Sequence, residues 1–594
     1  MKCFKKFWLI TIISFLLGSC SSSAPKQNSS LTESSSEISS SEIASSSEII
    51  SSSSNEEKSD SEGASSEISE ISTSEILSSE EESESIESSQ YTESLSEESS
   101  EVIESSESIS SESSEESSTE PRTPETFKFY AVNDFHGAVN KFENDRGYLE
   151  KGMANYFGYL KDVKNADPEH TFVFSAGDMW EGSYESNFNY GELVTEAMNM
   201  VPFDAMTLGN HEFDWGQDKI AHNAEIAEFP MLCANIREYK YGYISEKFPW
   251  KYADLIGSST IIEKSNYKIG VVGTIGSSEI TSITSSRVSD IGFLSEEVIA
   301  TEEAVKLKES GCDAVILLAH YDAGDIHSWS CYKNLKTYFD GVFCAHTHTS
   351  NNENKNGVPL VQSYCNGQAY SYFELTIDDE GVTCNKQAIT YGYEAEDTTY
   401  DYFEDFYQDY LVTSGVKEKL NTIAGTLVGG NLTKTTSANL GNVAVYEHYI
   451  DLYPDLAITM MNDQRSNINE GEVTYSDIFK ALPFFNQIVI VKLSGKNIKS
   501  AGSRSNFDTY IGDTETYDYF ENDKLYTVAI IDYLLYHQNT SRIYNYFTDM
   551  STGVAEVIAT YPTYPADLIF EYMQEKQTIY ADDYSNFAPG INTL

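Results

Sequence analysis

Between residues 126 and 395, short and nearly continuous apolar runs alternate with longer helical stretches. The runs of strand length are FKFYAVND (127–134), TFVFSAGD (171–178), FDAMTLGN (203–210), KIGVVGTI (268–275), DAVILLAH (313–320) and GVFCAHTH (341–348). Between several of them lie helical stretches such as MANYFGYLKDVKNA (153–166) and SEEVIATEEAVKLKES (295–310). Apolar strands joined by crossover helices predict an α/β domain over 126–395 with a buried, mostly parallel sheet. Ligands of such folds gather at the carboxyl ends of the strands.

The pattern changes at Glu396. The next stretch is aromatic, acidic and helical in character, and we interpret residues 396–420 as a connecting helix. Residues 421–594 again mix strand and helix patterns and are rich in tyrosine, so a second α/β domain is expected there. The chain contains no internal repeat.

The first 20 residues have the features of a secretory signal peptide. Three lysines precede the apolar run from Phe7 to Leu17, which is too short to span a bilayer, and small residues lead to Cys20. The stretch LGSC resembles a bacterial lipobox, which implies lipidation of Cys20 and a lipid-anchored protein on the extracellular face of a bacterial membrane. An ordinary signal peptide that happens to contain a cysteine is the alternative.

Serine and glutamate dominate the next hundred residues. Residues 21–120 carry 26 acidic residues and two lysines, with too few apolar side chains to offset the entropy of ordering. We expect a disordered stalk over 21–125. The whole chain has a net charge of −56 and no basic stripe, which argues against binding to nucleic acid.

Six cysteines follow the stalk, at positions 233, 312, 331, 344, 365 and 384. None has the spacing of a metal-binding or redox pair, so we interpret them as buried thiols, with a single disulfide left open.

Five of the predicted strands end in side chains that can bind a metal ion. These side chains are Asp134 and His136, Asp178, Asn210, His320, and His346 and His348. A single Asp or His after a strand is usually a turn residue, but five strands of one sheet ending this way is different. Carboxylates and imidazoles converging on one edge would be costly without cations. Seven nitrogen and oxygen donors suffice for two divalent ions of the Mn²⁺, Zn²⁺ or Fe class, which would activate water against a phosphate ester.

The ordered motifs NDFHG, GD, GNHEFD, AH and AHTH resemble those of the calcineurin-like metallophosphatases. More narrowly, the chain resembles the bacterial secreted 5′-nucleotidase and UDP-sugar hydrolase family over roughly residues 126–590. The resemblance implies that Asp134, His136, Asp178 and His348 hold one metal ion and that Asp178, Asn210, His320 and His346 hold the other. It also implies that His211 and Asp214 form the catalytic pair, His211 facing the scissile phosphate. Glu212 is left with a structural role.

The second half resembles the family's C-terminal substrate-binding domain. The resemblance places Phe484 and Asn486 of the PFFN turn, and Tyr533 of the late strand YTVAIIDYLLY, against the base. Core packing of these aromatic residues is the alternative. Arg465 matches a substrate-binding arginine, while Lys434 replaces another, and Asn539 stands where a nucleoside-binding aspartate is expected.

These features predict a surface-anchored, dinuclear hydrolase of nucleoside 5′-monophosphates. UDP-sugars and 2′,3′-cyclic nucleotides remain alternative substrates. A catalytically silent adhesion module and a hydrolase of sulfur esters are the alternatives from other classes. Neither the preferred base nor the oligomeric state follows from the sequence.

Overall fold

The computed structural model of the protein describes residues 122–143, 149–240, 243–245, 254–462, 464–502, 508–510, 519–536 and 556–585. All of them fall within one compact unit, Ser113–Leu594. The predicted signal peptide, Cys20, the stalk up to residue 121 and Asn539 lie outside the described residues. Among the described helices, none is long and apolar enough to cross a membrane.

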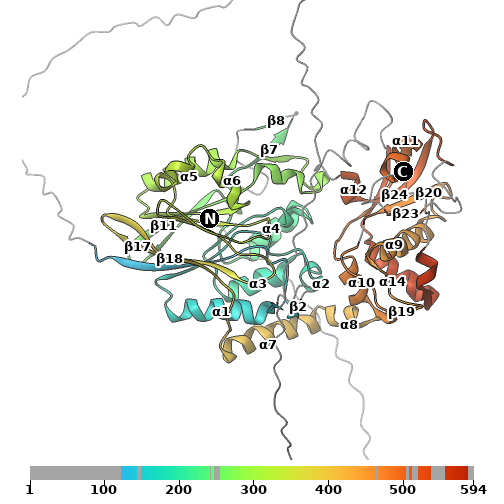
Figure 1. Ribbon diagram of the computed structural model, residues 1–594, viewed down its shortest axis with the longest axis horizontal. Coiled ribbons are helices and arrows are strands. Elements are labelled where there is room, and N and C mark those ends of the chain that lie inside the picture. The colour runs from blue at the N-terminus through green and yellow to red at the C-terminus, as the bar shows by residue number, and fades with distance from the viewer. Residues whose placement is uncertain are drawn as a thin grey trace, which may run out of the picture. The chain divides into compact units, whose positions relative to one another are not determined.

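Two sheets packed face to face form the framework of the first half (Figure 1). The seven-stranded sheet has the order β18-β17-β1-β4-β5-β6-β9 and the six-stranded sheet the order β10-β11-β13-β14-β16-β15. The strands of the first sheet are β1 (Glu125–Val132), β4 (Thr171–Ser175), β5 (Ala205–Thr207), β6 (Met231–Leu232), β9 (Ile256–Gly257), β17 (Tyr370–Asp378) and β18 (Gly381–Thr390). Those of the second are β10 (Ser259–Lys264), β11 (Tyr267–Ile275), β13 (Ala314–His320), β14 (Gly341–Cys344), β15 (Asn351–Lys355) and β16 (Val358–Gln362).

The space between the sheets is filled by aromatic and aliphatic side chains. Phe174 on β4 meets Phe343 on β14 with 6.5 Å between ring centroids. Gly273 on β11 allows the sheets to approach closely, because a Cβ atom there would lie 2.5 Å from Cβ of Leu232. This core sets the distance between the strand ends of the two sheets.

The expected α/β class and mostly parallel pairing are confirmed and all six predicted strands exist, but the strands form two sheets and not one. β1, β4 and β5 are parallel neighbours in one sheet, and β11, β13 and β14 are parallel neighbours in the other. Antiparallel strands flank each parallel group, as β17 does beside β1 and β10 beside β11. A strand buried on both faces has the same apolar pattern whether a helix or a second sheet covers it, so the sequence could not separate the two arrangements.

Helices cover the outer faces of the two sheets (Figure 1). α1 (Gly152–Ala166) packs beside β4, and α5 (Glu296–Glu309) packs on β11 and β13. Both match their predicted ranges to within one residue. The remaining helices of this half are α2 (Tyr184–Asn187), α3 (Glu192–Met200), α4 (Gln217–Ile226) and α6 (Ala323–His327).

The connecting segment consists of two helices and not of one. α7 (Asp397–Thr413) packs along α1, and α8 (Val416–Asn421) follows it. The break falls at Gly415, whose φ of 79° is left-handed and is accessible to glycine without strain.

The second half contains a five-stranded sheet of order β23-β20-β24-β22-β25 and a three-stranded sheet of order β21-β19-β26. Its strands are β19 (Ile423–Val428), β20 (Leu456–Met461), β21 (Gly471–Thr474), β22 (Ile488–Ser494), β23 (Asp508–Tyr510), β24 (Leu525–Ile531), β25 (Glu556–Tyr561) and β26 (Thr578–Tyr580). Its helices are α9 (Lys434–Tyr449), α10 (Tyr475–Ala481), α11 (Gly495–Gly502), α12 (Asp532–Tyr536) and α14 (Pro565–Lys576). The mixed α/β character expected for this half is confirmed.

All six cysteines of the described residues are free thiols. Cys233 and Cys344 are buried as expected, whereas Cys312, Cys331, Cys365 and Cys384 are only half-buried. No disulfide forms among these six.

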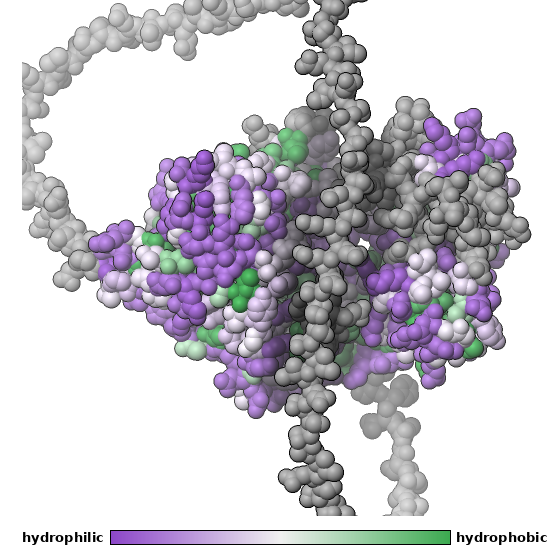
Figure 2. Space-filling model, viewed as in Figure 1, coloured by the Kyte–Doolittle hydropathy of each residue, from purple (hydrophilic) through white to green (hydrophobic). Residues whose placement is uncertain are grey.

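Arg122 holds the amino end of the described fold. Its guanidinium lies 2.7 Å from Asp313 Oδ1 and 3.0 Å from Asp379 Oδ1, and it lies over the ring of Tyr267. Asp313 precedes β13 and Asp379 lies in the turn between β17 and β18, so Arg122 contacts both sheets. Hydrophilic side chains are spread widely over the coloured part of the surface in Figure 2.

Candidate metal centre and substrate cavity

The predicted metal ligands all lie at or just after the carboxyl ends of parallel strands, and His320 is itself the last residue of β13. Three of these strands belong to the seven-stranded sheet and two to the six-stranded sheet. The backbone is left-handed at most of the ligand positions, with positive φ at Asp134, His136, Asp178, His346 and His348. Residues other than glycine seldom adopt this conformation, so five instances in one place mark strain of the kind that functional sites hold.

The first cluster joins the loop after β1 to the loop after β14. Ligand atoms of Asp134, His136 and His348 lie within 4.8 Å of one another. Nε2 of His136 is 3.0 Å from Nε2 of His348, and the latter is 3.6 Å from Asp134 Oδ1. Asp134 is fully buried.

The second cluster lies where β4, β5, β13 and β14 end. Ligand atoms of Asp178, His320 and His346 lie within 4.8 Å of one another. Oδ1 of Asn210 is 3.2 Å from Nε2 of His320 and 2.9 Å from Nδ1 of His346. Oδ2 of Asp178 is 3.1 Å from Nε2 of His320 and 4.0 Å from Nε2 of His136. The Asp178 carboxylate therefore lies between the two clusters.

The donor atoms fit divalent cations. His136 and His320 each donate their Nδ1–H to a backbone carbonyl, of Glu181 and Ala176 respectively, so Nε2 of each ring is directed into the cluster. Burial, with His211 nearby, lowers the pKa of His136 to about 3, so its imidazole is neutral and able to ligate. His346 turns Nε2 to Glu279 at 2.8 Å, an outer carboxylate of the kind that orients metal-binding histidines. Converging lone pairs and carboxylate oxygens repel one another unless cations lie between them.

His211 begins the short 3₁₀ helix that follows β5 and points toward the same centre. Its Nδ1 lies 2.6 Å from Asp214 Oδ2, and its backbone N–H donates to Asp178 Oδ1 at 2.9 Å. Burial opposes a charge on this ring, but Asp214, Asp178 and Glu181 together raise the pKa of His211 well above its ordinary value. A charged imidazolium at this place is suited to donate to an anionic oxygen of a substrate.

Glu212 has the structural role expected of it. The side chain is fully buried and accepts backbone N–H bonds from Asp178 at 2.8 Å, Met179 at 2.8 Å and Gly209 at 2.7 Å. It thus ties the loop after β4 to the loop after β5. Without these bonds, the three amides would be buried and unpaired.

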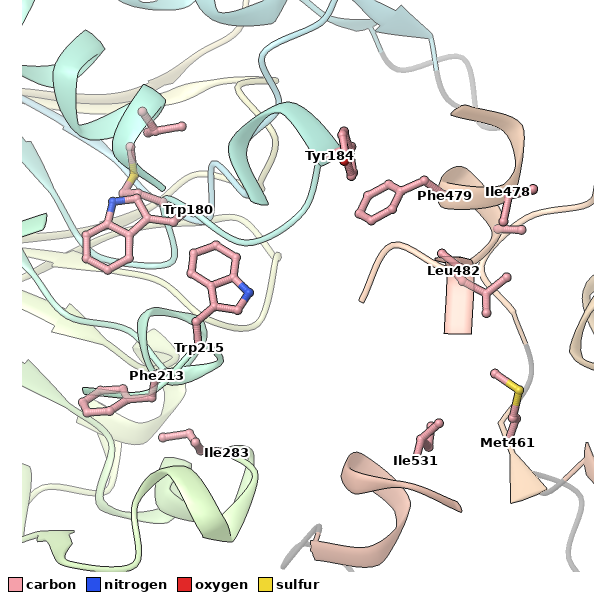
Figure 3. Close-up of a cluster of buried hydrophobic side chains, with 14 of the residues drawn as sticks. Trp180, Tyr184, Phe213, Trp215, Ile283, Met461, Ile478, Phe479, Leu482 and Ile531 are labelled. Carbon is pink, nitrogen blue, oxygen red and sulfur yellow. The ribbon is translucent and has the colours of Figure 1, made fainter. Parts of the chain in front are cut away.

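A cavity of about 360 Å³ extends from His211 and His346 into the second half of the molecule. Asp214 and Trp215 line it on the first half, and Arg465, Phe484 and Asn486 line it on the second. Beside the cavity the halves touch through aromatic rings: Tyr184 points toward Phe479 with 5.0 Å between centroids (Figure 3).

Four of the predicted substrate residues line this cavity, namely Arg465, Phe484, Asn486 and Tyr533. The Arg465 guanidinium lies 4.8 Å from the ring centre of Phe484, a cation–π contact. Tyr533 belongs to the first turn of α12 and not to the preceding strand, because β24 ends at Ile531.

Lys434, the remaining described residue of that set, does not line the cavity. This residue is exposed at the first position of α9. Helix α9 begins there because Thr433 caps it, accepting from the N–H of Thr436. Asn539 lies outside the described residues.

Sequence reasoning missed three charged residues of the cavity wall. Glu181 follows Asp178 in the same loop, Arg287 lies in a 3₁₀ turn (Ser285–Arg287), and Asp532 follows β24. Burial, together with Asp214 and Asp178, raises the pKa of Glu181 to about 8 against the opposing effect of His211. The rule that identified the ligands, a polar residue directly after a strand, points equally to Asp532. No motif marks Arg287.

Comparison with known proteins agrees with this geometry. Residues 127–350 match the calcineurin-like phosphoesterase family, and residues 419–509 match the C-terminal domain of 5′-nucleotidases. The endonuclease YhcR of Bacillus subtilis (strain 168) is 24% identical over 418 residues, which are 64% of this chain and 33% of that protein. The snake venom 5′-nucleotidase of Crotalus adamanteus is 25% identical over 438 residues, 63% of this chain and 69% of that enzyme.

Among solved structures, the 5′-nucleotidase precursor of Thermus thermophilus superposes with a TM-score of 0.57 over 76% of this chain and 97% of its own, at 16% identity. This similarity shows a shared fold. The fold and the histidine–carboxylate clusters agree with the family matches. The chain belongs to the calcineurin-like phosphoesterases that carry a 5′-nucleotidase C-terminal domain, a family of phosphoester hydrolases. It spans one third of the length of the Bacillus endonuclease.

Proposed function

We propose that the protein is a dinuclear phosphohydrolase whose main reaction is hydrolysis of nucleoside 5′-monophosphates to nucleoside and phosphate. The shared cavity carries this proposal. One wall holds His211 and the ligand Asn210, and the opposite wall holds Phe484 and Tyr533. A nucleotide has a phosphate at one end and a flat aromatic base at the other, and the cavity offers suitable groups for both ends in one space.

Two divalent ions fit the donor set best. Asp134, His136, Asp178 and His348 would hold one ion, and Asp178, Asn210, His320 and His346 the other. Mixed imidazole, carboxylate and amide donors suit ions of the Mn²⁺, Zn²⁺ or Fe class. Ions held there supply Lewis-acid polarisation of the phosphoryl group and activation of water.

The protein's own side chains position and stabilise the substrate. His211 donates to a phosphoryl oxygen as negative charge develops, and Asp214, at 2.6 Å, orients the ring and favours the imidazolium. Phe484 and Tyr533 stack on the base, Asn486 bonds its edge, and Arg465 contributes a positive charge near the phosphate. Arg287 is the second arginine of the cavity wall.

A panel of substrates tests this function. The purified protein is loaded with Mn²⁺ or Zn²⁺, its metal content is measured, and phosphate release is followed with AMP, GMP and UMP. UDP-glucose, 2′,3′-cyclic AMP and single-stranded DNA complete the panel. We expect two metal ions per chain and the highest kcat/KM for the monophosphates. A value at least tenfold higher for the UDP-sugar, the cyclic nucleotide or DNA would replace this function, and full metal occupancy without turnover would favour a binding module.

We also propose that the protein is anchored to the outer face of a bacterial membrane through a lipid on Cys20. The basic start, the apolar run and the LGSC stretch support this. The stalk over residues 21–125 would then separate the domains at 126–395 and 421–594 from the membrane. Fatty-acid labelling should mark the wild-type protein and not the Cys20→Ser variant, which should appear in the medium.

A further inference from the structure

Glu181 lies in the loop between β4 and α2 with its backbone fixed on both sides. Its carbonyl oxygen accepts the Nδ1–H of His136 at 2.9 Å, and the next residue, Gly182, donates its N–H to Asn187 Oδ1 at 2.9 Å. The residue is only 4% exposed and lines the cavity. The direction of its side chain is therefore set by the metal-binding loop itself.

The two oxygens of the Glu181 side chain differ. Oε2 lies 3.5 Å from Nδ1 of His211, which has a closer partner in Asp214 at 2.6 Å. Oε1 is buried and has no hydrogen-bond partner among the described residues. A buried polar atom left unpaired is costly, and in a cavity wall it is a place where a ligand can supply the missing bond.

The neighbours of Glu181 indicate what kind of group would supply this bond. Phosphate oxygens accept hydrogen bonds, and the donors of the cavity that suit them are His211, Arg287 and Arg465. These three donors can serve the phosphate oxygens, whereas Oε1 of Glu181 suits a partner that can both donate and accept a hydrogen bond. The base is assigned to Phe484 and Tyr533 on the other half, whereas Glu181 lies beside His211, next to the scissile phosphate. The groups nearest the phosphate that carry a hydrogen are the hydroxyls of the sugar.

We propose that Glu181 is a specificity-determining residue that hydrogen-bonds a ribose hydroxyl of the substrate through Oε1. The proposal rests on the nucleotidase function and assigns the part of the substrate that the metal-bearing half recognises. It holds for either protonation state of Glu181, because a hydroxyl can both donate and accept. A site built to bond a hydroxyl rejects the analogue that lacks it, since the buried partner is then left unpaired.

The test compares AMP with 2′,3′-dideoxy-AMP. In the wild-type protein we expect kcat/KM to favour AMP by roughly 10- to 100-fold, the range for a hydrogen bond to a charged group. In Glu181→Leu the ratio should fall to about threefold or less, and in Glu181→Gln, which keeps an acceptor and a donor, it should stay between these limits. If Glu181 acted only by orienting His211, both rates would fall together and the ratio would not change, which would overturn the proposal.

Glu185 provides the matched control. It is a buried acid four residues away, but it already accepts from Asn140 Nδ2 at 2.6 Å and Tyr407 OH at 3.1 Å and does not line the cavity. Glu185→Gln should leave the AMP to dideoxy-AMP ratio at the wild-type value. Thermal unfolding and metal content, measured for each variant, show that the fold and the metal centre persist.

Binding measurements separate this inference from the proposed function. Calorimetry with adenosine and 2′,3′-dideoxyadenosine needs no turnover. If no phosphate ester is hydrolysed but adenosine binds at least tenfold tighter than the dideoxy compound, and Glu181→Leu removes the difference, the function is wrong and the assignment of Glu181 stands. If AMP is hydrolysed and the wild-type protein does not distinguish the two nucleosides, the function stands and the role of Glu181 is wrong.

Discussion

At the scale of single residues, the Asp178 carboxylate contacts both metal-binding clusters and the backbone of His211. Its Oδ2 faces His320 in one cluster and His136 in the other, and its Oδ1 accepts from the backbone of His211. Replacing it with asparagine keeps the size and one acceptor but removes the charge that two cations would share. We expect Asp178→Asn to abolish phosphate release with the fold intact, and metal analysis to find fewer than two ions per chain. Wild-type turnover with two bound ions would show that Asp178 does not bridge.

His211 differs from the ligands because its Nδ1 is bound to Asp214. His211→Ala should lower kcat by ~10²–10³-fold, the usual cost of removing one donor aimed at developing charge, while the metal content stays at the wild-type value. Asp214→Asn should lower kcat by a smaller factor, since the ring remains. Loss of a metal ion from His211→Ala would instead make His211 a ligand.

At the scale of elements, the loops after β4 and β5 are held to each other by Glu212. Glu212→Gln leaves one oxygen for three backbone N–H groups and turns an amide N–H toward another donor. A buried donor left without a partner costs about 1–3 kcal/mol, so we expect a loss of about that size in the free energy of unfolding. Chemical denaturation measures it. Glu225→Gln, an exposed site on α4, is the control and should stay within about 0.5 kcal/mol of wild type.

The turn that follows α10 carries Phe484 into the cavity. Stacking on one aromatic face contributes ~1–3 kcal/mol and tolerates any base. Phe484→Ala should therefore raise KM for AMP, GMP and UMP alike and change KM for a simple aryl phosphate much less. Equal losses for all four substrates would assign Phe484 to packing, for instance beneath the Arg465 guanidinium that lies over its ring.

Each of the six strands that the apolar pattern predicted in the first half exists, and the candidate metal ligands lie at the ends of five of them. The pattern could not divide the strands between two sheets, because burial on both faces has one signature. The pattern also extended the late strand through Tyr533, although α12 begins at Asp532. The five residues of this helix are too few to show a helical period in the sequence. The break at Gly415 is visible in the sequence only as a glycine, and its left-handed φ decides the outcome.

Within the site, residues that belong to a sequence motif could be predicted, whereas residues that only the fold brings to the site could not. The ligands follow strands in recurring combinations such as NDFHG and AHTH. Glu181 and Arg287 line the cavity because of where the fold places them, and no motif in the neighbouring sequence indicates this. Lys434, which the resemblance assigned to the substrate site, lies on the surface.

At the scale of the whole molecule, Arg287 and Asp532 join the two halves at the cavity with 3.6 Å between Nη2 and Oδ2. Oδ1 of Asp532 also accepts from the backbone of Gln487 at 3.0 Å and Tyr533 at 2.9 Å, so one carboxylate connects the turn that holds Phe484 to the start of α12. Burial raises the pKa of Asp532 to about 6, against the opposing effect of Arg287 and with a smaller contribution from Asp214.

This raised pKa predicts how stability depends on pH. Asp532 has a higher pKa in the folded state than the value of about 3.9 in an unfolded chain, so its contribution is fully present below pH ~4 and is lost as the pH rises through about 6. Relative to Asp532→Asn, the wild-type protein should lose up to about 2–3 kcal/mol of unfolding free energy between pH 4 and 7. Denaturant unfolding of both proteins across this range measures the difference. A difference that does not vary with pH would show that Asp532 titrates normally.

The contacts of Arg122 bear on how the fold responds to mechanical force. Its guanidinium forms ion pairs at the start of β13 and in the β17–β18 turn, which belong to different sheets. Strand β1 begins three residues later and lies between β4 and β17. Tension applied to the chain ahead of this point would be shared by both sheets and would load β1 in shear, across its whole ladder of hydrogen bonds, instead of peeling it open one bond at a time. The ligand loops lie at the opposite ends of these strands, about 25 Å away along an eight-residue strand. A pulling force on the amino-terminal side would therefore strain the end of the sheets near Arg122 before it changed the distances between the histidines.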